Sequence, residues 1–103
     1  MAFAQYIPVN AGASTQTVDG TAGLLTAEAT VPVTARYAEG FVRTASVVFY
    51  RDGSTPTATA GEQADIGDRI ILRSREEIEK ASFIRAGGTS ATIDWQFWTS
   101  PGF

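Results

Sequence analysis

Hydrophobic and polar residues alternate along several short stretches of this chain, and alternation with a period of two is the pattern of a half-buried β-strand. The alternation is clear in residues 29–37 and again in residues 89–98. Residues 41–51 are rich in valine and aromatic residues, which strands favour. The predicted strands cover residues 3–9, 29–37, 41–51, 54–59, 69–73, 81–86 and 89–98.

Two glycine-containing pairs predict tight hairpins. Asp52-Gly53 supplies the positive φ angles of a type I′ turn and would join the preceding strand to an edge strand that contains Pro56. Gly87-Gly88 would join the last two predicted strands and fix their register. This register places one set of side chains in the core: Ile84, Ala91, Ile93, Trp95 and Phe97. It leaves the opposite set mostly exposed: Phe83, Arg85, Thr92, Asp94, Gln96 and Trp98.

One helix interrupts the predicted strands. Ser74, followed three residues later by Glu77, matches a capping box, and only one or two helical turns fit before β-character returns. Residues 10–28 begin with many small residues and offer few large side chains to bury, so we expect a long loop or an extended arm.

Together these elements predict an all-β fold: a compact β-sandwich or small barrel of about 6–8 short strands, with one short helix near residues 75–80. The chain has 103 residues, which fits a single domain over residues 1–103. Hydrophobic residues make up 44% of the sequence, which is enough to build one core.

Charge and composition narrow the possible functions. The net charge is −3 and the eight lysine and arginine residues are scattered, so we expect no nucleic-acid binding. The chain has no cysteine and no histidine, which removes the usual ligands of zinc and haem. We therefore expect no cofactor and no metal. Neither a signal peptide nor a long apolar segment is visible, so a soluble protein that contacts no membrane is the default expectation.

Carboxylates are the remaining candidates for catalysis or for binding a hard cation such as calcium. Asp65 and Asp68 flank a glycine, which is typical of a turn, and Glu76 and Glu77 suit the start of the predicted helix. Local structure explains all four residues, and histidine, the usual base of a hydrolase triad, is missing. The sequence therefore predicts a protein that is not an enzyme.

Aromatic residues near both ends of the chain are the best candidates for a binding surface. Trp98 falls on the face opposite the predicted core, and Phe103 follows a Pro-Gly pair. Exposed aromatic residues are enriched at the centres of protein interfaces. The predicted interface residues are Trp98, Phe103, Phe83, Phe3 and Tyr6.

One stretch of sequence resembles a known group of proteins. Residues 67–78 read Gly-Asp-Arg-Ile-Ile-Leu-Arg-Ser-Arg-Glu-Glu-Ile, and residues 83–89 read Phe-Ile-Arg-Ala-Gly-Gly-Thr. These segments, followed by an alternating terminal strand, resemble small virion structural proteins of tailed bacteriophages, in particular capsid decoration (cement) proteins. The resemblance covers about a third of the chain. It implies a location in the virion, the major capsid protein as partner, and a head stabilised by clamping neighbouring capsid subunits. Self-association as a homotrimer is expected, because a capsid lattice offers three-fold positions.

Two other functions stay open on the sequence alone. The chain could be another virion component, namely a tail, head–tail joining or fibre-associated protein that grips host glycans. From a different class, it could be a small hydrolase that uses the carboxylates described above.

Overall fold

The computed structural model describes residues 7–99, except for the side chains of residues 9–11. Its strands form two antiparallel sheets of four strands each, which confirms the predicted mainly-β fold. Sheet A, in spatial order, contains β1 (Ile7–Val18), β8 (Ala91–Thr99), β3 (Tyr37–Arg43) and β6 (Arg69–Leu72). Sheet B contains β2 (Gly23–Leu24), β7 (Ser82–Arg85), β4 (Val47–Tyr50) and β5 (Glu62–Ala64).

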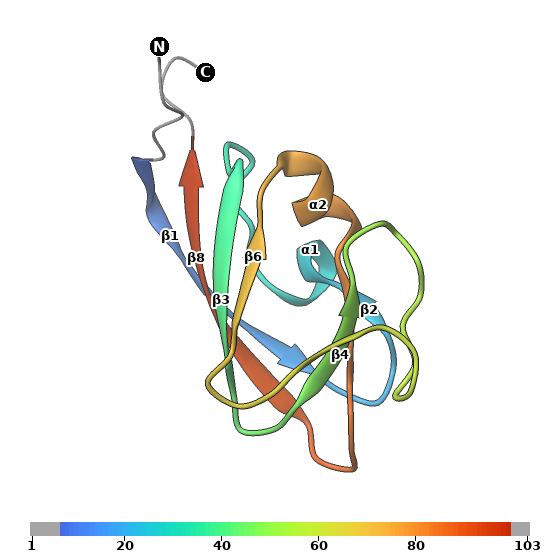
Figure 1. Ribbon diagram of the computed structural model, residues 1–103. Helices are drawn as coiled ribbons and strands as arrows, with labels where there is room; N and C mark the ends of the chain where they lie inside the picture. Colours follow the sequence, from blue (N-terminus) through green and yellow to red (C-terminus); the bar gives the residue numbers. More distant parts are fainter. Residues whose placement is uncertain (1–6, 100–103) are drawn as a thin grey trace.

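Figure 1 shows the two sheets as separate layers, with the short helices α1 (Leu25–Glu28) and α2 (Arg75–Lys80) packed together near one end of the molecule. Most connections carry the chain from one sheet to the other, so the core forms between residues distant in sequence. Buried side chains from both sheets form one hydrophobic cluster. At its centre the aromatic rings of Phe49, Phe83, Trp95 and Phe97 lie in a series with centroids 5.4 to 6.3 Å apart.

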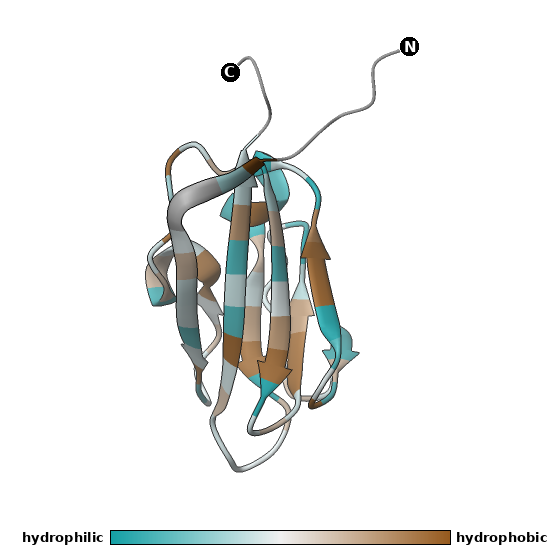
Figure 2. Cartoon of the chain, turned by 90° about the vertical axis from the view of Figure 1, so that its left-hand side faces the viewer, coloured by the Kyte–Doolittle hydropathy of each residue, from teal (hydrophilic) through white to brown (hydrophobic). Residues whose placement is uncertain are grey.

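Strand β8 follows the predicted alternation. Ala91, Ile93, Trp95 and Phe97 are buried, whereas the residues between them are partly exposed. Burying each large apolar side chain contributes about 1.5–3 kcal/mol, so this single strand supplies a large share of the core. Figure 2 views the molecule from the side on which sheet A lies in Figure 1, and hydrophilic and hydrophobic bands succeed one another along its strands.

Helix α2 forms where the capping box predicted it. The Ser74 side chain accepts a hydrogen bond of 3.1 Å from the Glu77 backbone N–H. The Glu77 carboxylate reaches back to the N–H of Arg73 at 2.9 Å, one residue before the expected partner. The first bond satisfies an N–H group that the first helical turn leaves unpaired, and the second holds the residue just before the cap.

The hairpin predicted at Gly87-Gly88 is wrong. Strand β7 pairs with β4 and β2, while β8 pairs with β1 and β3 in the other sheet. Neither glycine has the positive φ that a type I′ turn requires, and residues 86–90 instead carry the chain between the sheets. The predicted faces of β7 change as a result: Phe83 is fully buried against Phe49, and Ile84 is only half-buried.

Asp52-Gly53 does turn the chain, but it does not close a hairpin. The Asp52 carboxylate accepts a 2.9 Å hydrogen bond from the N–H of Ser54, and Gly53 has φ of 93°. The segment 54–59 then forms a loop whose buried Pro56 anchors it, not the predicted edge strand. The partner of β4 in this part of sheet B is β5, which lies outside the predicted strands.

The N-terminal predictions also change. The segment 10–28 is not a long loop or arm, because β1 runs to Val18 and β2 and α1 follow it. Strand β8 has two edges to pair, and the small residues of β1 let it lie along one of them, from Ile7 opposite Thr99 to Val18 opposite Ala91.

Two predicted strands have other boundaries. Residues 29–36 form a loop, and β3 begins only at Tyr37. The predicted strand 41–51 is split into β3 and β4 at Thr44, where φ is 76° and the Ala45 N–H bonds to the Arg43 carbonyl at 2.9 Å. This tight turn sends β4 into the opposite sheet.

Candidate binding surface

The structure places two of the five predicted interface residues. Trp98 is half-buried near the end of β8, on the outer side of sheet A. Phe83 is fully buried in the core and offers nothing to a partner, so this prediction is wrong. Phe3, Tyr6 and Phe103 lie outside the described residues.

Trp98 is the centre of an apolar row across three strands. Tyr37 on β3 and Pro8 on β1 are its register partners on either side. The rings of Tyr37 and Trp98 meet edge to face, with centroids 5.5 Å apart and an angle of 71°. Such a pair contributes about 0.5–1.5 kcal/mol beyond its buried area, so it holds the indole in one place.

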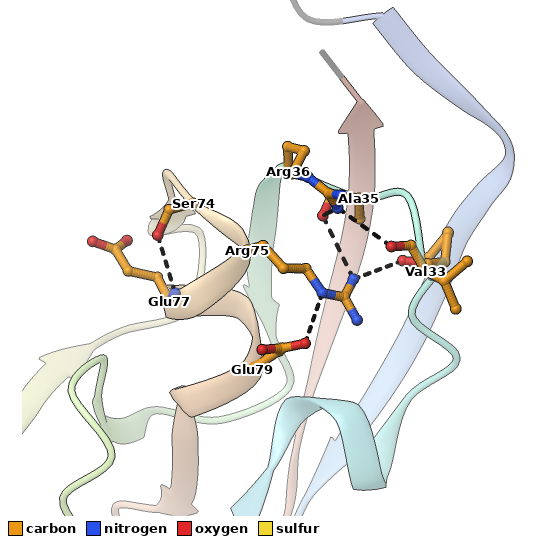
Figure 3. A network of polar contacts seen from close by, with 8 residues as sticks. Val33, Ala35, Arg36, Ser74, Arg75, Glu77 and Glu79 are labelled. Carbon is orange, nitrogen blue, oxygen red and sulfur yellow. Dashed lines mark hydrogen bonds and ion pairs between the residues drawn. The ribbon is translucent and has the colours of Figure 1, made fainter. Parts of the chain in front are cut away.

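Val33 lies at the same end of sheet A, on a loop that is fixed by arginine side chains. The Arg36 N–H bonds to the Trp98 carbonyl at 2.8 Å, which ties the loop to the end of β8. Arg75 on α2 donates to the Pro32 carbonyl at 2.8 Å and pairs with Glu79 at 3.0 Å (Figure 3).

The guanidinium of Arg36 completes the hydrogen-bond network that holds this loop. Arg36 donates to the carbonyls of Val33 at 3.3 Å and Ala35 at 3.1 Å, and Arg75 lies 3.5 Å from the same Ala35 oxygen (Figure 3). The Val33 side chain is nevertheless 82% exposed. An apolar residue is thus presented to solvent on an immobilised backbone.

We call this surface the aromatic end. It consists of Ile7, Pro8, Val33, Tyr37 and Trp98. Ile7, like Val33, is an exposed hydrophobic residue, at 48%. Val33 and Tyr37 were not among the predicted interface residues, although both lie in the alternating segment 29–37.

Another exposed apolar residue lies at the opposite end of β3. Ile66 is 63% exposed on the turn Asp65-Ile66-Gly67-Asp68, which we call the acidic turn. The Asp68 carboxylate accepts from the Asp65 N–H at 2.8 Å, and the Gly67 N–H bonds to the Val42 carbonyl at 2.8 Å. Hydrogen bonds from the side chains of Gln63 and Ser46 lower the pKa of Asp65. The turn is therefore rigid and negatively charged.

Between these two ends, the outer face of sheet A is polar. Arg43 pairs with Asp94, which also accepts from Thr15 at 3.2 Å. Arg69 pairs with Glu39 at 3.5 Å and lies over the ring of the neighbouring Phe41, 5.2 Å from its centroid. Exposed ion pairs of this kind contribute about 0–1 kcal/mol each to folding stability, so their main effect is to make this face polar.

The four candidate carboxylates do not form one site. Asp65 and Asp68 precede β6 and Glu76 and Glu77 follow it, so the two groups lie at opposite ends of that strand. Glu76 pairs with Lys80 at 3.5 Å. Among residues 7–99, no group of three or more acidic side chains is arranged to hold a metal ion.

The core contains a series of hydrogen-bonded polar groups, which we call the polar chain and which the sequence did not indicate. The Trp95 indole N–H donates to the Gln16 side-chain oxygen at 2.9 Å, and the Gln16 amide donates to the Glu28 carboxylate at 2.8 Å. Burial raises the pKa of Glu28, the bond from Gln16 opposes this, and the charge of Asp19 raises the pKa further. Gln16 had been assigned to a loop, so nothing in the sequence indicated its burial. The chain fastens α1 and β1 to β8.

No protein-family model matches this chain, and no curated protein or solved structure matches it significantly. Within the described part of the chain, no helix has the length and apolar character needed to cross a membrane.

Proposed function

We propose that this chain is a non-catalytic structural protein of a tailed-phage virion, namely a capsid decoration protein that clamps neighbouring subunits of the major capsid protein. The observation that carries the proposal is the aromatic end, where Val33 and Ile7 are exposed at the end of sheet A that also holds the half-buried Trp98. Surfaces that combine exposed apolar residues with anchored aromatic rings are typical of protein interfaces.

The rigidity of the aromatic end supports a binding role. Association costs free energy for every side chain and loop that becomes ordered, about 0.5–1.5 kcal/mol for each flexible side chain. Here Arg36 and Arg75 already hold the loop of Val33, and Tyr37 already holds Trp98. Less free energy is therefore lost when a partner such as a capsid subunit binds.

The test uses heads of the encoding phage that were assembled without this chain. The purified chain should bind these heads at many copies and raise the temperature at which they rupture. Trp98→Ala should weaken this binding by about tenfold or more, as expected for an aromatic anchor. Phe41→Ala is the matched control, because it also removes a half-buried ring from sheet A, but away from the aromatic end. Heads without the chain that are complete and as heat-resistant as decorated ones would overturn the proposal.

A tail, head–tail joining or fibre-associated virion protein is the second candidate. The observation in its favour is that Trp98 and Tyr37 lie partly exposed on a β-sheet surface, where an aromatic ring can stack on a sugar. Electron microscopy separates the two candidates. A decoration protein covers the head at many copies, whereas a tail component occurs at few copies at one vertex.

A further inference from the structure

We propose that two copies of this chain associate head to tail, with the aromatic end of one copy docked on the acidic turn of the next. This inference deepens the proposed function, on which it rests for its place in a virion. The contact itself can be measured on the isolated chain.

The two surfaces lie too far apart to cover each other within one copy. The loop of Val33 joins sheet A next to Tyr37, at the start of β3. The acidic turn is bonded to Val42 near the end of the same strand. Tyr37 and Val42 are five residue steps apart along the strand, which is about 17 Å. Two different surfaces at opposite ends of one molecule favour a heterologous contact, which repeats from copy to copy.

The charges at the two ends are complementary. From residue 29 to residue 38 the only charged side chain is Arg36, and residues 7–8 and 96–99 carry no charge. At the other end, Asp65 and Asp68 flank Ile66 on either side.

The charged residues next to the acidic turn and the aromatic end do not cancel the difference in charge between these two surfaces. Arg69, which follows the acidic turn, pairs with Glu39. Glu79 on α2 pairs with Arg75, the residue that holds the Val33 loop. Head-to-tail docking would therefore bring Ile66 against the apolar row and its two carboxylates toward Arg36. Docking two aromatic ends together would instead oppose two cations.

Val33 and Ile66 both lie on backbone that is already fixed by hydrogen bonds. This reduces the free energy needed to order the two surfaces on docking. The contact is nevertheless small, and interfaces below about 1,200 Å² are generally weak and transient. Such a contact gains strength when several copies bind simultaneously on a lattice. In an open row of copies, the first one keeps its aromatic end free for the proposed capsid contact.

The test measures solution mass by sedimentation over a range of protein concentrations. Val33→Asp blocks the aromatic end, and Ile66→Asp blocks the acidic turn. Leu24→Asp is the matched control, because Leu24 is an exposed apolar residue, at 42%, that belongs to neither surface. Each blocked variant should associate at least about tenfold more weakly than the control. Mixed in equal amounts, the two variants should form a heterodimer and nothing larger, since one intact contact remains between them.

Several results would overturn the inference. The inference fails if the wild-type protein stays monomeric at the highest concentration reached. It also fails if the blocked variants associate as well as the Leu24→Asp control. Dimers of Ile66→Asp alone, with no gain on mixing, would show a symmetric contact instead. Thermal melts check folding, and Val33→Ser and Ile66→Ser replace any variant that melts early. Binding to phage heads is measured separately, so either proposal can fail while the other stands.

Discussion

Replacing Gly40 with alanine tests the packing of the core directly. Gly40 is buried in the middle of β3, opposite Trp95 on β8. A Cβ atom there would lie 2.7 Å from Ile93 Cγ2 and 2.8 Å from Trp95 Cε3, closer than such atoms approach in folded proteins. Both neighbours are almost fully buried, so neither can move aside without disturbing the layer behind it.

The magnitude follows from two opposing effects. Overpacking a core costs about 1–3 kcal/mol. Replacing glycine with alanine also reduces the entropy of the unfolded chain, which stabilises by about 0.4–1 kcal/mol where the backbone accepts a side chain. Gly40 is not among the residues with positive φ, so the backbone accepts alanine and the steric cost decides. We expect a net loss of about 1–2 kcal/mol, or a Tm lowered by about 4–15 °C.

The assay is thermal and urea unfolding followed by circular dichroism and tryptophan fluorescence. Gly87→Ala is the matched control: it makes the same chemical change, its φ is not positive, and its Cβ would meet nothing within 4 Å. This control should be as stable as the wild type or slightly more stable. If Gly40→Ala unfolds at or above the temperature of the control, the packing of Trp95 over β3 described above is wrong.

Two further predictions concern the buried polar chain. Gln16→Leu leaves the Trp95 indole N–H without a partner and should lower the free energy of unfolding by about 1–3 kcal/mol in urea titrations; the exposed Thr17→Leu is its control, and equal effects of both would count against the buried bond. Glu28→Gln should change the pH dependence of stability. Because the folded-state pKa of Glu28 is raised above 4.5, its stabilising contribution is complete below that pH and is lost as the pH rises through the folded-state value. The Tm of Glu28→Gln relative to wild type should therefore increase from pH 4 to pH 7, and a constant difference would contradict this.

Local chemistry made part of the fold predictable. The cap of α2 depends on Ser74 and Glu77 alone, and the inner face of β8 depends on its own alternation, so both could be read without knowing their neighbours. The partner of a strand is a different matter. Glycine pairs such as Gly87-Gly88 permit a hairpin, but whether β8 pairs with β7 or with β1 and β3 depends on the packing of the whole core.

The binding surface was predictable only in part, for the same reason. The alternation of β8 indicated that Trp98 faces outward. Val33 lies in a segment that alternates like a strand, but this segment is a loop held by the side chains of Arg36 and Arg75 and by backbone hydrogen bonds. Ile66 gave no signal, because a single apolar residue in a turn looks like any other.

The position of β8 has a consequence for how the chain folds. This strand lies between β1 and β3, and its hydrogen bond from Thr15 to Asp94 joins residues 79 positions apart. Among residues 7–99, β1 pairs in sheet A with β8 alone, so it stays unpaired on the ribosome until β8 has been synthesised. Chains dominated by such long-range contacts fold slowly, in about milliseconds to seconds. Sheet A, and with it the aromatic end, can therefore assemble only after β8 has left the ribosome, which delays any partner contact until the domain is whole.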